Sequence, residues 1–146
     1  MSVRVTISIA APIAQVWSVL ADVEHWSDWT PTISSVQRLE RGPFGPGSAA
    51  RIKQPKLPPV VWTVSEFVPL DHFTWSVASP GAVTIAGHQL APGPDGSVTV
   101  TLSIHRTGPL APLLDLVFGN LTREYVTTEA QCLKRTVEAR TTVAAA

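Results

Sequence analysis

Four side chains that can bind metals or transfer protons lie close together near the N-terminus, in the stretch ADVEHWSDWTP of residues 21–31. They are Asp22, Glu24, His25 and Asp28. Such groups form a metal or acid/base site only if their atoms converge on one point. Their spacing matches no strong zinc or calcium pattern, and carboxylates one helical turn apart are common on surfaces. We therefore expect no metal here, and we interpret Asp22 as the N-cap of a short helix.

His88 is the sharper candidate for chemistry, because we expect it among apolar side chains on the inner face of a sheet. A histidine titrates near neutral pH, so it could act as a general acid or base or orient a ligand carbonyl. Tyr125 could offer its hydroxyl to a ligand from a long helix. The alternative for each is structural: a histidine hydrogen-bonded within a core, and a tyrosine that packs. No carboxylate partner for His88 is evident on its face, which favours binding over catalysis.

The elements that must position these side chains follow from the hydrophobic pattern. Apolar and polar residues alternate over residues 3–9, which predicts a strand with one wet face. Pro12 suits the first turn of a helix that runs to about residue 22. From Ile33 onward, alternating runs broken by turn signals such as SPG and APGPDG predict six strands joined largely by hairpins. A long helix is expected over about residues 109–140.

The long helix is the only element that can cover the apolar face of a curved antiparallel sheet. Its inward stripe is expected to consist of Leu110, Leu114, Val117, Leu121, Tyr125, Thr128 and Cys132. Gly119 costs roughly 1 kcal/mol against alanine, so a kink or close packing is expected there. The tail of residues 141–146 is expected to be frayed.

Hairpin geometry indicates which side chains face this helix. A two-residue loop at Pro80 and Gly81 places Phe73, Trp75 and Val77 on one face with His88, Ala86 and Thr84. The next hairpin adds Val98, Val100, Leu102 and Ile104. The preceding hairpin is expected to add Val61, Thr63, Ser65 and Phe67, with Ile52 and Gln54 beyond them.

The inner face expected in this way is mostly apolar but carries several polar groups. An unpaired buried polar group costs about 1 to 3 kcal/mol, so a hydrated or ligand-filled cavity is expected between sheet and helix. In the same register Trp62 falls on the outer face, where a cation–π contact with Lys53 is expected.

Length, charge and cysteine content limit the classes of protein to which this chain can belong. A chain of 146 residues has the size of one domain, 1–146, and its eleven basic and eleven acidic residues cancel. No nucleic-acid partner is therefore expected. The single cysteine, Cys132, suits a reducing compartment, and the alternating N-terminus resembles neither a signal peptide nor a membrane span. We expect a cytoplasmic protein without stable membrane insertion.

Several familiar catalytic and cofactor motifs are absent from the sequence. There is no phosphate-cradling glycine loop, no nucleophile elbow, and no HExxH or CxxC pattern. No cofactor is expected. Cys132 is interpreted as a small hydrophobe rather than a nucleophile.

Six segments, in order, resemble the polyketide cyclase/dehydrase-like branch of the START-like (SRPBCC) superfamily. They are APIAQVWSVLADVEHWSDWTP, GSAARIKQP, VWTVSEFVP, FTWSVASPG, GHQLAP and GPLAPLLDLVFGNLTREY. The resemblance implies an α+β helix-grip fold: a seven-stranded curved antiparallel sheet around a long C-terminal helix, with two short helices after the first strand and a deep apolar cavity. It also implies that the two tryptophans of the opening stretch pack the fold. Members described as aromatase/cyclases hold a polyketide, and relatives carry lipids, hormones or sterols.

Three functions remain open, because fold similarity alone cannot choose among them. The leading hypothesis is binding of a small hydrophobic or amphipathic molecule, such as a lipid, polyketide or aromatic metabolite. The expected ligand-binding residues are Phe67, Phe73, Trp75, His88, Val100, Leu102, Phe118, Leu121 and Tyr125. The alternative is an aromatase/cyclase or dehydratase in which His88 or Tyr125 moves a proton. A third hypothesis is an interaction module that uses an exposed Trp62 and the KLPP edge.

Overall fold

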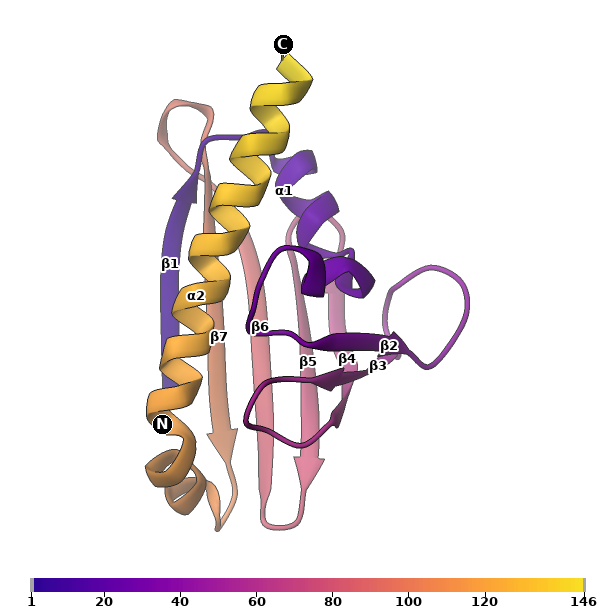
Figure 1. Cartoon of the computed structure of the whole chain (residues 1–146), viewed down its shortest axis with the longest axis vertical. Helices are drawn as coiled ribbons and strands as arrows, with labels where there is room; N and C mark the ends of the chain where they lie inside the picture. The colour runs from indigo at the N-terminus through magenta and orange to yellow at the C-terminus, as the bar shows by residue number, and fades with distance from the viewer. Residues whose placement is uncertain (1, 146) are drawn as a thin grey trace.

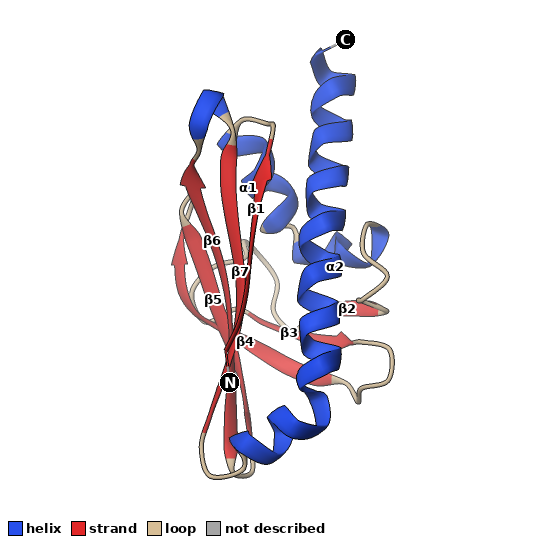
Figure 2. Ribbon diagram, turned by 90° about the vertical axis from the view of Figure 1, so that its left-hand side faces the viewer, coloured by secondary structure: helices blue, strands red, loops and turns tan. Residues whose placement is uncertain are grey.

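A seven-stranded antiparallel sheet packs against one long helix in the computed structural model, which describes residues 2–145 and the side chains of residues 2–141 (Figures 1 and 2). The strands are β1 (Ser2–Ile9), β2 (Ser35–Arg38), β3 (Ala49–Lys53), β4 (Val60–Val68), β5 (His72–Ser79), β6 (Ala82–Pro92) and β7 (Val98–Thr107). The helices are α1 (Ile13–Leu20), the short 3₁₀ helices η1 (Val23–Asp28) and η2 (Pro94–Gly96), and α2 (Ala111–Ala145). The expected α+β helix-grip architecture is confirmed.

The sheet order is β1-β7-β6-β5-β4-β3-β2, so β1 closes one edge against the last strand and the hairpins fill the rest. In Figure 1, β2 and β3 run across the direction of the other strands. The sheet therefore curls, and its concave face is covered by α2, α1 and η1 (Figure 2).

The register of the two central hairpins agrees with the prediction. Ser79 pairs with Ala82 across the turn, and Phe73 pairs with His88. His88 in turn lies opposite Leu102 on β7. Because side chains alternate between the two faces of a sheet, these pairings put His88 on the inner face, as expected.

A β-bulge in β4 overturns the register predicted for the preceding hairpin. Val64 pairs with Trp75 and Glu66 with Thr74, so the strand carries one extra residue at Ser65. One extra residue reverses which face the following side chains occupy. The expectation was right for Phe67, which packs against the core beyond the bulge. The inward placement of Val61, Thr63 and Ser65 was wrong, and all three are exposed.

Trp62 is consequently an inner-face residue. It is only 9% exposed, and its ring centroid lies 5.8 Å from that of Trp75. The expected contact with Lys53 is wrong, since the Lys53 ammonium donates instead to the carbonyl of Gln54. The interaction surface built on an exposed Trp62 loses its basis for the same reason.

The helix α2 meets the sheet through a stripe that differs in part from the expected one. Beyond its first turns, its buried hydrophobic side chains include Val126, Ala130, Leu133 and Val137, whereas Leu110 and Val117 are 44% and 62% exposed. The first turns of α2 bend away from the axis of the rest (Figure 2). Because the helix bends, different helical positions face the sheet before and after the bend. One continuous stripe of residues therefore does not include both sets. Gly119 is buried, in agreement with the expected close packing.

The C-terminal end of the chain is helical beyond the expected boundary. The helix α2 continues past residue 140 to Ala145. The expected fraying of the tail stays a prediction, and Ala146 lies outside the described residues. Within residues 2–145 no helix is both long enough and apolar enough to cross a membrane.

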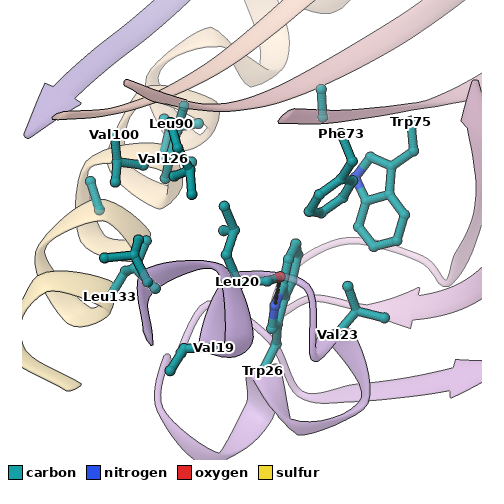
Figure 3. Close-up of a cluster of buried hydrophobic side chains, with 14 of the residues drawn as sticks. Val19, Leu20, Val23, Trp26, Phe73, Trp75, Leu90, Val100, Val126 and Leu133 are labelled. Carbon is teal, nitrogen blue, oxygen red and sulfur yellow. Dashed lines mark hydrogen bonds between the residues drawn. The ribbon is translucent and has the colours of Figure 1, made fainter. Parts of the chain in front are cut away.

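A cluster of aromatic rings lies where η1 meets the middle of the sheet. Figure 3 shows Phe73 and Trp75 on the sheet side and Trp26 facing them from η1. The Trp26 ring lies 5.3 Å from that of Trp75, and its indole N–H donates to the carbonyl of Leu20 at 3.0 Å. Because the ring is buried and its N–H is hydrogen-bonded, Trp26 anchors η1 onto the sheet.

Candidate binding pocket

The four ionisable side chains of the opening stretch, Asp22, Glu24, His25 and Asp28, are all exposed. His25 Nδ1 lies 2.9 Å from the Asp22 carboxylate, and this exposed hydrogen bond raises the pKa of the imidazole. Asp22 occupies the N-cap position of η1, as expected, but its side chain makes no capping hydrogen bond. Within the described part of the chain, no three histidine, cysteine or acidic side chains are grouped so as to hold a metal ion.

A pocket of about 320 Å³ lies between the concave face of the sheet and α2. Its walls come from β3 to β7, the loop after β3, η1 and the first half of α2, and most of the side chains are apolar. Trp26, Trp75 and His88 are buried at one end, whereas Pro58 and Ser79 are exposed at the other. The pocket therefore has a deep aromatic end and an outer end near the loop that contains KLPP.

The expected ligand-binding residues divide into two groups. Six of them line the pocket: Trp75, His88, Leu102, Phe118, Leu121 and Tyr125. The other three, Phe67, Phe73 and Val100, belong to the hydrophobic core and are not among the residues that line it. Phe73 and Val100 are completely buried, because the aromatic cluster and the helices fill that part of the inner face.

His88 is held rigidly on the sheet side of the deep end. Its ring stacks on Phe73 with centroids 4.1 Å apart, and Nδ1 lies 3.2 Å from the Phe73 carbonyl oxygen. Donation from Nδ1 to this carbonyl leaves Nε2 with a lone pair. Burial lowers the pKa of His88 to about 4, because the charged imidazolium would lose its hydration. At neutral pH His88 is thus an uncharged hydrogen-bond acceptor.

Glu129 is an ionisable pocket residue that sequence reasoning did not single out. It lies on α2, lines the pocket, and accepts a hydrogen bond from the Thr32 hydroxyl at 3.0 Å. Burial raises the pKa of Glu129 to about 7, and the bond from Thr32 opposes this shift only in part. One sequence signal could have found it: Glu129 follows Tyr125 by four residues, one helical turn along the inward face.

A short hydrogen-bonded chain orients the Glu129 carboxyl group. The Thr32 hydroxyl has one proton, which it gives to Glu129, so the Thr30 hydroxyl must donate to Thr32 across 2.9 Å. Both threonines are buried, at 1% and 3% exposure. The Thr30 backbone N–H binds the carbonyl of Trp26 at 3.1 Å. The segment after η1 therefore ties Glu129 to the tryptophan at the deep end.

The two remaining ionisable side chains of the pocket are engaged elsewhere. Arg106 donates to Asp115 at 3.0 Å and to the Thr122 hydroxyl at 2.8 Å, which compensates its charge. The Tyr125 hydroxyl donates to the carbonyl of Pro55 and links α2 to the loop after β3. Tyr125 therefore lines the pocket with its ring, while its proton serves the protein's own backbone.

The chain matches one protein-family model over residues 1–139, nearly its whole length. That family is described as polyketide cyclase/dehydrase and lipid transport. This chain belongs to that family. The family resemblance expected from the sequence is thereby confirmed, whereas the family description alone leaves the ligand and any reaction open.

Solved structures of similar fold come from several bacteria. TTHA0849 from Thermus thermophilus is 19% identical with a TM-score of 0.75, covering 96% of this chain and 99% of that one. XoxI from Bacillus cereus is 18% identical with a TM-score of 0.74, covering 93% and 94%. The hypothetical protein jhp0584 from Helicobacter pylori is 13% identical with a TM-score of 0.81, covering 94% and 88%. These likenesses establish the fold of this family member. No functionally curated protein matches the chain.

Proposed function

We propose that this protein binds one small hydrophobic or amphipathic molecule in the pocket between the sheet and α2. The observation that carries the proposal is the pocket itself, about 320 Å³ of space bordered mostly by apolar side chains. Ligand sites generally have volumes of about 300 to 1,000 Å³ and a few convergent polar groups among apolar walls. The volume favours a ligand of modest size over a complete two-chain lipid.

The few polar side chains of the pocket fix the orientation of the ligand. His88 offers Nε2 as an acceptor from the sheet, and Glu129 offers its carboxyl group from the helix. The apolar contact would come from Trp75, Leu102 and Leu121, whose side chains border the same space. An apolar ligand that fills this space removes the pocket walls from water. This contributes a favourable free energy of about 25 cal/mol per Å² of apolar surface buried.

A pair of tryptophan substitutions on α2 tests this proposal. Leu121→Trp places a bulky ring in the pocket, whereas Leu116→Trp puts the same ring on a position that is 82% exposed. Binding of the neutral probe N-phenyl-1-naphthylamine is followed by its fluorescence, and native mass spectrometry gives the stoichiometry. We expect one probe per wild-type chain, similar binding by Leu116→Trp, and at least about tenfold weaker binding by Leu121→Trp. Absence of binding, or equal binding by both variants, would refute the proposal.

A second candidate function is proton-transfer catalysis in the same pocket, of the aromatase/cyclase or dehydratase kind. Glu129 favours it, because a carboxyl group with a pKa of about 7 can both give and take a proton at neutral pH. His88 would serve as the acceptor rather than the acid, since its pKa of about 4 leaves it neutral.

The catalytic candidate is tested by single turnover of a synthetic poly-β-ketone thioester, with products separated by chromatography. We expect Glu129→Gln to abolish cyclised or dehydrated product and His88→Asn to reduce it. The exposed Glu124→Gln on the same helix is the matched control. Unchanged turnover in Glu129→Gln would remove this function.

A further inference from the structure

The deep end of the pocket combines an ionisable carboxyl group with several aromatic rings. Trp26, Trp62 and Trp75 all line the pocket, and Trp75 lies between the other two, 5.3 Å and 5.8 Å away between ring centroids. Trp26 is also joined to Glu129 through the hydrogen-bonded chain of Thr30 and Thr32. Tryptophan faces are the strongest side-chain partners for organic cations.

Among the described side chains, no cationic group is paired with the Glu129 carboxyl group. The one hydrogen bond that it makes with these side chains comes from the neutral Thr32 hydroxyl. Within the described side chains, the only buried side-chain polar atom without a partner is Trp29 Nε1, so the second carboxylate oxygen of Glu129 is not sealed inside the protein. A carboxylate in apolar surroundings gains most from a positive charge, because the low dielectric strengthens the attraction.

The other titratable groups that line the pocket do not supply that charge. His88 on β6 is neutral, with Nδ1 engaged by the Phe73 carbonyl. Arg106 on β7 binds Asp115, and Tyr125 on α2 binds the Pro55 carbonyl. A positive charge that complements ionised Glu129 in the pocket would therefore come from a ligand.

We propose that the ligand is a hydrophobic amine whose ammonium group lies between the Glu129 carboxylate and the rings of Trp26, Trp62 and Trp75. This proposal rests on the proposed binding function and names its ligand class. The apolar part of the amine occupies the part of the pocket that Phe118 and Leu121 line. Bound cation and ionised Glu129 stabilise each other, so the amine binds together with loss of the Glu129 proton.

A pair of isosteric probes separates charge from shape. The cation is (naphthalen-2-ylmethyl)trimethylammonium, and the neutral partner is 2-neopentylnaphthalene, in which a carbon atom replaces the ammonium nitrogen. Dissociation constants are measured by isothermal titration calorimetry. At about pH 8 the cation is expected to bind at least about tenfold more tightly than the neutral probe. Between about pH 8 and pH 6 its affinity is expected to fall about tenfold, because Glu129 takes up a proton, while the neutral probe changes less than about twofold.

Two matched variants show whether Glu129 causes the preference for the cation over the neutral probe. Glu129→Gln is expected to weaken the cation at least about tenfold and to leave the neutral probe within about twofold, which also shows that the pocket is intact. Glu124→Gln, the same change at an exposed position of α2, is expected to leave both affinities unchanged.

The outcomes distinguish the two proposals. If neither probe binds, the proposed binding function fails, and the amine proposal fails with it. If the neutral probe binds as tightly as the cation, or Glu129→Gln keeps the preference, the amine proposal alone is overturned. It is likewise overturned if 2-acetonaphthone, a neutral ketone, binds more tightly than the cation and gains affinity toward acid, because protonated Glu129 then donates to a carbonyl.

Discussion

The sheet wall and the helix wall of the pocket each bury one titratable group, but they support it differently. On the sheet, His88 is stacked on Phe73 and hydrogen-bonded to its backbone, with Trp26 and Trp75 around it. On the helix, Glu129 has a single bond from Thr32 and borders open space. Burial favours the neutral form of both, so the pKa of His88 falls to about 4 and that of Glu129 rises to about 7.

The comparison teaches that the same desolvation acts in opposite directions on a base and an acid, because it moves the pKa of the histidine away from neutrality and that of the carboxyl group toward it. The tightly packed histidine stays neutral throughout the physiological range. The carboxyl group beside the pocket is poised to change charge, and a ligand can reach it. The carboxyl group on α2 is thus the one of the two whose pKa lies near neutrality, whereas the sequence pattern indicated His88 on the sheet and Tyr125 on the helix as candidates.

Removing the ring that supports His88 is expected to have the largest effect. Phe73 is completely buried, so Phe73→Ala leaves a cavity and lowers the free energy of unfolding by about 3 to 5 kcal/mol. Urea denaturation monitored by far-UV circular dichroism measures this. The His88 bond to the backbone carbonyl of residue 73 remains possible, so the loss reports packing alone. A loss below about 1 kcal/mol would contradict a tightly filled sheet wall.

Glu129 is expected to make the folded state less stable as the pH rises. Its pKa in the folded state, about 7, lies above the value of 4.5 that it has when unperturbed, so the folded state binds more protons between these values. The stabilisation by its proton is present below about pH 4.5 and disappears as the pH rises through 7, a change of about 3 kcal/mol. Unfolding free energies of the wild type and Glu129→Gln from pH 5 to pH 8 measure it. Parallel curves would show that Glu129 is hydrated.

His88 is expected to act in the opposite direction at acidic pH. Its pKa falls from 6.5 to about 4 on folding, so the unfolded chain takes up the proton first. Stability is then lost as the pH drops below 6.5, by about 2 kcal/mol at pH 5. Glu129 opposes this slope in the wild type, so Glu129→Gln should be compared with Glu129→Gln/His88→Asn by urea titration. Equal slopes in the two would mean that His88 is accessible to water.

Removing the support of Glu129 is expected to have the smallest effect. Thr32→Val deletes the hydroxyl that donates to Glu129, lowers stability by about 1 kcal/mol and raises the carboxyl pKa further. Thr32→Ser keeps the hydroxyl and serves as the control. Carbon-detected NMR titration of the Glu129 carboxyl reports the pKa directly. An unchanged titration in Thr32→Val would show that the hydrogen bond does not hold the carboxylate.

Much of the fold could be predicted because local patterns and hairpin turns carry it. The turn at residues 80 and 81 correctly placed Phe73 opposite His88, and therefore His88 on the inner face. Trp62 was misplaced because a bulge adds one residue without a distinctive sequence mark, and Ser65 is an ordinary strand residue. Phe67, Phe73 and Val100 were assigned to ligand binding because an alternating pattern gives the face of a side chain but not what covers it.

The sequence by itself determined the order of elements and the buried side of the central hairpins, because these depend on periodicity and turn chemistry over a few neighbouring residues. The family followed from the resemblance of its segments to known sequences. Only the tertiary structure decided which part of the buried face is filled and which is open, and it revealed the carboxyl group there. In the sequence, Glu129 is indistinguishable from an ordinary helix residue. In the folded chain, the curled sheet and the segment of Thr30 and Thr32 enclose it. Its altered pKa comes from desolvation, which residues distant in sequence produce together.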